Sequence, residues 1–364
     1  MRTRFAPTAL VVTVALSLAA CQTTTPAPDQ GGAGGDAAAK VEEAAAPDAK
    51  LTMMFKALPA DMADAEHPIA EARVNLGRML YYETRMSKNH DLSCNSCHML
   101  DKYGVDNEPT SPGHKGVRGG RNSPTVYNAA LHTAQFWDGR AADVEAQAKG
   151  PILNPVEMAM PDDASVVAVI KSIPGYEPLF KEAFPDAEDP ITYDTIAAAI
   201  GAFERTLVTP GRFDAYLAGD ASRLTPEEVE GGKLFIETGC TTCHMGAVVG
   251  GNMYQKLGLV KPYETADEGR FEVTGNESDK HVFKVPSLRN IAKTGPYFHD
   301  GSVKTLDEAV KIMAEYQLGK ELSDEDTTKI VTFLTALTGE LPTDRIGKPE
   351  LPESGPTTPK PDPS

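Results

Sequence analysis

The chain has 364 residues, and its 52 acidic side chains outnumber its 35 basic ones, so the formal net charge is −17 at pH 7. Such an acidic protein is repelled by phosphate backbones and by anionic lipid surfaces, which excludes nucleic acid as a partner and favours a basic protein surface. The length is enough for about two domains of ordinary size.

The first twenty residues have the pattern of a bacterial export signal. Arg2 and Arg4 precede an apolar run over residues 9–20, and small residues lead into Cys21. The run is too short to span a bilayer as a mature helix, and its end resembles a lipobox, in which the cysteine is acylated. An ordinary signal peptide is the alternative. Either one predicts a protein that works outside the cytoplasm, on the periplasmic side of a bacterial envelope. The lipobox also predicts a lipid anchor at Cys21 as the one attachment to the membrane.

Both ends of the mature chain have a composition that does not support a packed core. Residues 21–50 are rich in Ala, Gly, Thr, Pro and acids, which predicts a flexible linker, and residues 341–364 predict a Pro-rich extension. The fold is therefore expected between residues 51 and 340.

One short motif occurs twice, as LSCNSCH over residues 92–98 and as GCTTCH over residues 239–244. Paired cysteines in an exported protein could form disulfides, a zinc site or a redox dithiol, but none of these explains the histidine that follows each pair. In C-x-x-C-H, the two thiols bind the vinyl groups of one haem and the imidazole reaches the iron. The motifs predict two haem c groups with His98 and His244 as proximal ligands. The attachment cysteines are Cys94, Cys97, Cys240 and Cys243.

The repetition extends beyond the motifs. LGRMLYYET precedes the first motif and GGKLFIETG the second, where Thr225 and Glu228 predict a capping box at the start of the helix. QFWDGR and YFHDGS follow the two motifs at matching spacing, so Trp137 and His299 are equivalent. Helical periodicity fills most of the remaining chain, and strand signals are scarce. We therefore predict an all-α fold of two cytochrome c-like domains, residues 51–209 and 210–340.

The second axial ligand of each iron decides between electron transfer and catalysis, because an enzyme must open one axial position for its substrate. His114 lies in the Gly-rich loop TSPGHKGVRGG, from which a ligand could swing away, whereas Met313 lies on a predicted helix. Spacing alone leaves these choices open. The candidates are His90, His114 and His132 for the first haem, and Met245, Met253, Met313, His281 and His299 for the second.

A larger set of motifs carries a resemblance to a known family. These motifs are LSCNSCH, PTSPGH, RNSPTVYNAALHTAQFWDGRAADVEAQAKGPI, VEMAM, GCTTCH, VPSLRN, GPYFHDG and AVKIMAEYQLG, in this order. Over nearly all of residues 51–339 the chain resembles the bacterial di-haem cytochrome c peroxidases. The resemblance implies an enzyme that reduces hydrogen peroxide to water with electrons from a small periplasmic cytochrome c or blue-copper protein.

The resemblance also implies roles for single residues. His114 matches the distal histidine of the peroxidatic haem, Met313 matches the axial methionine of the electron-accepting haem, and Glu157 matches a pocket glutamate credited with acid–base help. A methionine ligand raises the reduction potential of a haem, and a pocket carboxylate can shuttle the proton that O–O cleavage requires. The two haem domains are thus expected to be chemically unequal.

Further implications concern the contact between the domains. Trp137 matches a tryptophan between the haems, and Asn122, Thr294 and Pro296 match a calcium site. The calcium site rests on the resemblance alone, because amide and backbone oxygens leave little trace in a sequence. The family also implies a homodimer.

Two alternatives stay open at this level. A di-haem enzyme of the same superfamily matures a quinone cofactor, but it has tyrosine at the position of Met313 and no loop ligand like His114. A non-catalytic di-haem electron carrier would keep both irons saturated, and neither Glu157 nor a releasable His114 suits that role.

Overall fold

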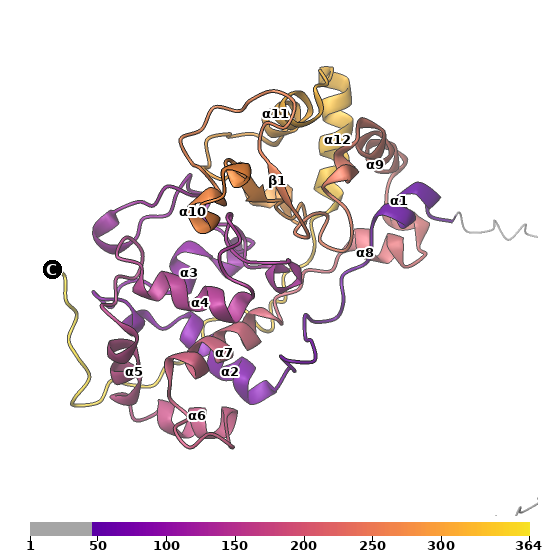
Figure 1. Ribbon diagram of the computed structural model, residues 1–364. Helices are drawn as coiled ribbons and strands as arrows, with labels where there is room; N and C mark the ends of the chain where they lie inside the picture. Colours follow the sequence, from indigo (N-terminus) through magenta and orange to yellow (C-terminus); the bar gives the residue numbers. More distant parts are fainter. Residues whose placement is uncertain (1–45) are drawn as a thin grey trace, which may run out of the picture. The chain divides into compact units, whose positions relative to one another are not determined.

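The computed structural model describes residues 46–364 (Figure 1). The predicted export signal, the predicted anchor at Cys21 and most of the predicted linker lie outside the described residues. The prediction of a largely helical fold is confirmed, since the described part of the chain contains one short two-stranded sheet. The α-helices are α1 (Ala49–Met54), α2 (Glu71–Tyr81), α3 (Cys94–Cys97), α4 (Val144–Leu153), α5 (Asp163–Lys171), α6 (Tyr176–Ala183), α7 (Tyr193–Glu204), α8 (Arg212–Leu217), α9 (Pro226–Thr238), α10 (Phe271–Thr274), α11 (Leu306–Leu318) and α12 (Asp324–Ala336).

Short 3₁₀ helices and one two-stranded antiparallel sheet complete the secondary structure of the described residues. Strands β1 (Tyr254–Lys256) and β2 (Val282–Lys284) pair antiparallel, with Gln255 opposite Phe283. None of the helices within residues 46–364 is long and apolar enough to cross a membrane. The 3₁₀ helices are η1 (Thr84–Met86), η2 (Leu100–Lys102), η3 (His114–Gly116), η4 (Ala129–Leu131), η5 (Ala221–Arg223), η6 (Cys240–Thr242), η7 (Glu277–Asp279) and η8 (Ile291–Lys293).

The first hydrophobic core forms where α2 crosses α7. The helices approach closely because Gly77 lacks a side chain: a β-carbon there would lie 1.8 Å from the carbonyl oxygen of Ala199. Tyr81 and Phe203 pack beside the crossing with ring centroids 5.4 Å apart. Nearly all buried members of this core come from residues 74–207.

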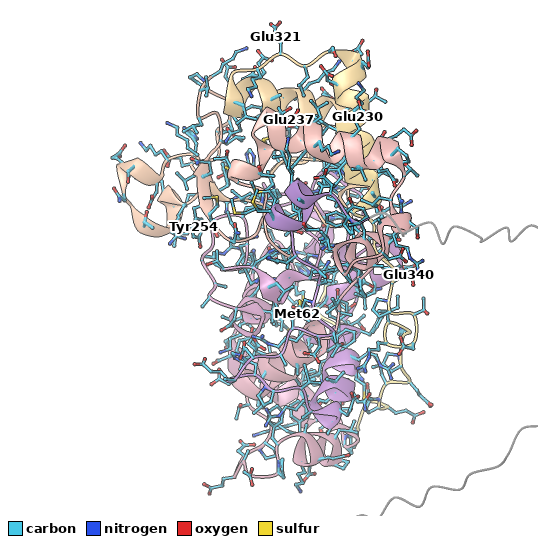
Figure 2. The ribbon with its side chains drawn as sticks, turned by 90° about the vertical axis from the view of Figure 1, so that its right-hand side faces the viewer. Met62, Glu230, Glu237, Tyr254, Glu321 and Glu340 are labelled. Carbon is cyan, nitrogen blue, oxygen red and sulfur yellow. The ribbon has the colours of Figure 1, made fainter. Side chains whose placement is uncertain are left out.

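The second core repeats this arrangement with α9 and α12. A β-carbon at Gly231 would lie 2.0 Å from the carbonyl oxygen of Lys329, and the rings of Phe235 and Phe333 lie 5.6 Å apart. The capping box predicted at Thr225 is present at the start of α9. Glu230 and Glu237 of α9 and Glu321 point away from this core into solvent (Figure 2).

Two segments depart from the predicted boundaries. Helix α1 begins at Ala49, capped by the side chain of Asp48, and its Leu51 is buried in the second core although it precedes the first in sequence. The extension after residue 340 lies along the first core. There Tyr82 Oη donates to the carbonyl of Ile346 at 2.5 Å, and the yellow chain end runs past α5 (Figure 1).

The two cores meet at Thr209. Asn128 and Asn290, which occupy equivalent places after the two motifs, have left-handed backbone conformations with φ of 61° and 62°. The Nδ2 atom of each donates to Oγ1 of Thr209 at 2.9 Å. The hydroxyl group of Thr209 thus accepts one hydrogen bond from each half of the chain. The described residues 46–364 belong to a single compact unit. The predicted boundary between two domains at residues 209 and 210 stays a prediction.

Candidate haem sites

A mostly apolar cavity of about 240 Å³ lies beside the second C-x-x-C-H motif. Cys240 and Cys243 come from η6 and its end, His244 follows them, and Met313 reaches the cavity from α11. Burial lowers the pKa of His244 to about 4, and its Nδ1 lies 3.3 Å from the carbonyl oxygen of Val249. The imidazole is therefore neutral near pH 7 and keeps Nε2 available as a metal donor.

The chemistry of this donor set fits a haem c. Both thiols are free of disulfide bonds, and burial raises the pKa of Cys240 to about 12. A neutral imidazole and a thioether in one apolar cavity are donors of the kind that haem iron accepts. The structure therefore brings together the four residues that the sequence assigned to the second haem.

The other predicted candidates for the second haem are placed less suitably. His299 also lines the cavity, but its ring stacks on Phe283 with centroids 4.5 Å apart and its Nε2 lies 3.0 Å from Thr265 Oγ1. Met245 is 38% exposed, and Nδ1 of His281 contacts the carbonyl of Asp267. Met313 lines the cavity from α11, and Met253 is not among the described residues that line it.

The first motif forms its own short helix, α3, which begins with a capping box at Ser93. The carbonyl of His98 accepts a hydrogen bond of 2.7 Å from Tyr81 Oη, which ties the motif to α2. Burial lowers the pKa of His98 and raises that of Cys94, so both groups are neutral near pH 7. The Nδ1 atom of His98 is buried without a hydrogen-bond partner in the described structure.

His114 and Glu157 are brought together by backbone contacts. The amide of His114 donates to the carbonyl of Glu157 at 2.8 Å. A β-carbon at Gly113 would lie 1.9 Å from the carbonyl oxygen of Val156, so only glycine permits this approach. The imidazole of His114 is buried, and its Nε2 lies 3.3 Å from the carbonyl oxygen of Ser364. The loop is therefore fixed through its backbone, while the ring contacts the extension.

Glu157 lies in a partly buried position beside the first motif. Burial raises its pKa, while Arg140 and the hydrogen bond from Asn154 Nδ2 to its Oε1, at 2.7 Å, act in the opposite direction. Its charge also contributes to the raised pKa of Cys97, after the larger effect of burial. A carboxyl group with a raised pKa keeps its proton to a higher pH than a free glutamate does, which suits a group that takes up and returns a proton.

Trp137 and the three residues of the predicted calcium site all line the cavity beside the second motif. The indole Nε1 of Trp137 donates to the carbonyl of Asn122 at 2.9 Å, and the amide of Asn122 donates to the carbonyl of His299 at 2.7 Å. Thr294 and Pro296 also line the cavity. The hydrogen bond from Asn122 to His299 thus joins the two halves of the chain.

Lys284 and His132 form a contact in the cavity that was not predicted from the sequence. Lys284 of β2 and His132 both line the cavity, and Lys284 Nζ lies 3.1 Å from His132 Nδ1. His132 was predicted only as a candidate ligand of the first haem. A lysine in the short segment HVFKVP carries no pattern that marks it as buried.

Comparison with known proteins agrees with this arrangement. The family described as di-haem cytochrome c peroxidase matches residues 71–222, and the cytochrome c family matches residues 228–338. Cytochrome c551 peroxidase of Nitrosomonas europaea is 50% identical over 79% of this chain and 86% of its own length. The enzyme of that name from Pseudomonas aeruginosa is 46% identical, with 86% and 91% covered. The crystal structure of a MauG-like protein associated with microbial copper homeostasis superposes with a TM-score of 0.71 at 28% identity, covering 81% of this chain and 97% of that one.

Proposed function

The chain belongs to the di-haem cytochrome c peroxidases, and from this premise we propose that it reduces hydrogen peroxide to water with electrons from a small periplasmic cytochrome c or blue-copper protein. The observation that carries the proposal is the inequality of the two motifs: one shares an apolar cavity with Met313, and the other lies near a loop histidine and a glutamate of raised pKa. Bound haem supplies one-electron chemistry and, where an axial position is open, a binding site for peroxide.

In the second site His244 and Met313 would hold the haem iron. A methionine sulfur stabilises the reduced state relative to a second imidazole, so these residues favour acceptance of an electron from outside. The donor would meet an acidic protein, since the formal net charge of the chain is −17 at pH 7. A basic donor is therefore expected to associate faster at low ionic strength.

In the first site His98 is assigned as the permanent ligand and His114 as the releasable one. His114 lies in a 3₁₀ turn between glycines, and its neighbour Lys115 has a φ of 57°. Reduction at the second site is proposed to release His114, as a two-state rearrangement of this loop. The carbonyl oxygen of Ser364 lies 3.3 Å from His114 Nε2, and it would contact this nitrogen whenever the imidazole does not bind iron.

Glu157 is assigned the proton transfer. Its carboxyl group can take a proton from the nearer oxygen of peroxide and return it to the departing one, so that two electrons and two further protons yield two water molecules. Asn154 orients Oε1 through its hydrogen bond of 2.7 Å. Trp137, on the wall between the motifs, is assigned to the electron path.

Calcium, assembly and location complete the proposal. Asn122, Thr294 and Pro296 offer amide and backbone oxygens, which are the donors that calcium prefers, and such an ion would hold the contact between the halves. We infer a homodimer from the family, and a periplasmic location with a lipid anchor at Cys21 from the export signal, which lies outside the described residues.

The Glu157→Gln variant tests the assignment of the proton carrier. We expect kcat to fall by about 10²- to 10⁴-fold, because the amide cannot transfer the proton, with the visible spectra of both haems unchanged. Glu182→Gln, an exposed acid of α6, is the matched control and should keep full activity. Full activity in Glu157→Gln would contradict the role.

A further inference from the structure

Lys284 is a buried cation without an anionic partner. Its side chain is 6% exposed, and burial alone lowers its pKa to about 8. Within residues 46–364 its Nζ forms no salt bridge, and its described contact is with His132 Nδ1 at 3.1 Å. Buried charges in proteins are ordinarily paired, because an unpaired one costs several kcal/mol of desolvation. The position of Lys284 therefore indicates that an anion is missing from the cavity.

His132 gives a second, independent sign of a missing ligand. Burial, followed by the charge of Lys284, lowers the pKa of His132, so its imidazole is neutral. Because Nδ1 accepts from the lysine, Nε2 carries the proton, yet Nε2 is buried with no hydrogen-bond partner in the described structure. Buried donors are rarely left unsatisfied. The two side chains together offer two donors that lack an acceptor.

The surroundings fix both groups in place. The backbone amide of Lys284 donates to the carbonyl of Trp137 at 2.7 Å. The ring of His132 packs against Gly251, where a β-carbon would lie 2.5 Å from Cδ2. Two rigid segments, one from each half of the chain, therefore hold the donors at the wall of the cavity that Cys240, His244 and Met313 also line.

We propose that Lys284 is the counter-charge for a propionate carboxylate of the second haem, and that His132 positions the lysine and donates to the same anion. A haem brings its own carboxylates into an otherwise apolar site, so it supplies the anion that the protein lacks there. A positive charge close to the haem stabilises the state with the extra electron. Lys284 thereby raises the reduction potential of the second haem beyond the effect of Met313.

The test is a spectroelectrochemical titration of the di-haem holoenzyme, without peroxide. Lys284→Met should lower the midpoint potential of the second haem, and Lys284→Arg should largely restore it. Lys256→Met removes a charge from the exposed end of β1, which pairs with β2, and serves as the matched control. Its shift should be much smaller, because water screens an exposed charge. Equal shifts in Lys284→Met and Lys256→Met would overturn the proposal.

A second readout follows the carboxylate itself. Loss of the lysine should move the propionate bending band in the resonance Raman spectrum, and an unmoved band would also overturn the proposal. If Lys284→Met folds without acquiring both haems, His132→Gln is the variant to measure. It keeps the charge of Lys284 and removes the imidazole that positions it. A shifted propionate band in His132→Gln would support the role of both residues, and an unshifted band would refute it. The inference rests on the second haem lying in this cavity, and neither readout requires peroxide turnover, so failure of the proposed enzymatic function would be seen separately.

Discussion

Burial removes the side chains of His244 and Glu157 from much of the surrounding water, and it shifts their pKa values in opposite directions. It lowers the pKa of His244 to about 4, which keeps the imidazole unprotonated and able to bind a metal. It raises the pKa of Glu157, which lets the carboxyl group retain a proton at higher pH. Desolvation disfavours the charged form in both cases. The same physical cause thus suits one residue to ligation and the other to proton transfer.

The carboxyl group of Glu204, at the end of α7, offers a way to measure how burial of an acid changes the free energy of unfolding. Burial raises its pKa to about 8, with the charge of Glu145 adding to the effect and Arg205 opposing it. The folded state therefore binds the proton more tightly than the unfolded state. The resulting stability is fully present below about pH 4.3, the unfolded value, and is lost as the pH rises through the folded pKa.

We therefore expect the wild-type protein to lose stability between pH 5 and pH 8 relative to Glu204→Gln, by up to about 4 kcal/mol. Thermal unfolding at a series of pH values measures the difference. Glu182→Gln, which changes an exposed acid, should run parallel to the wild type. If Glu204→Gln is also parallel to the wild type, the carboxyl group does not titrate in this range.

At the scale of elements, each core depends on a glycine where two helices cross. Helix α2 crosses α7 at Gly77, and α9 crosses α12 at Gly231, with β-carbon positions 1.8 and 2.0 Å from a facing carbonyl oxygen. No atom can occupy these positions without moving a helix. The first crossing carries Tyr81, which holds the carbonyl of His98, so its geometry bears on the haem site.

Gly77→Ala should therefore destabilise the protein by about 1–3 kcal/mol, the usual cost of overpacking a core. This sign is the opposite of the ordinary effect, because alanine in an exposed helix interior is about 1 kcal/mol better than glycine. Gly120→Ala is the control, since a β-carbon there meets no atom within 4 Å. Thermal unfolding of the holoenzyme provides the measurement. A stability equal to that of the wild type would show that the crossing can widen at no cost.

The helices and both motifs were predictable because their signals are local. The capping box at Thr225 and the helix that carries Met313 follow from spacings of three and four residues. Two contacts could not be predicted in this way, because they join segments far apart in the sequence. His114 and Ser364 are 250 residues apart, and His132 and Lys284 are 152 residues apart. A single sequence contains no period that reports such distances, and the burial of a lone lysine depends on the assembled fold.

For the whole molecule, the important feature is the continuity between the two halves. Thr209 accepts hydrogen bonds from Asn128 and Asn290, and Trp137 joins the loop of Asn122 to the strand of Lys284. Hydrogen-bonded contacts therefore join the cavity beside the second motif to the half of the chain that carries the first motif. We expect reduction at the second site to release His114 at the first.

The most direct test measures peroxide consumption with a reduced small cytochrome as donor, comparing fully oxidised with half-reduced enzyme while the visible spectrum is recorded. We expect turnover only after half-reduction, together with a high-spin signal that marks the departure of His114. Turnover while the spectrum still shows His114 bound would contradict the release step. No turnover in either state, with both haems low-spin throughout, would contradict the peroxidase itself and indicate an electron carrier.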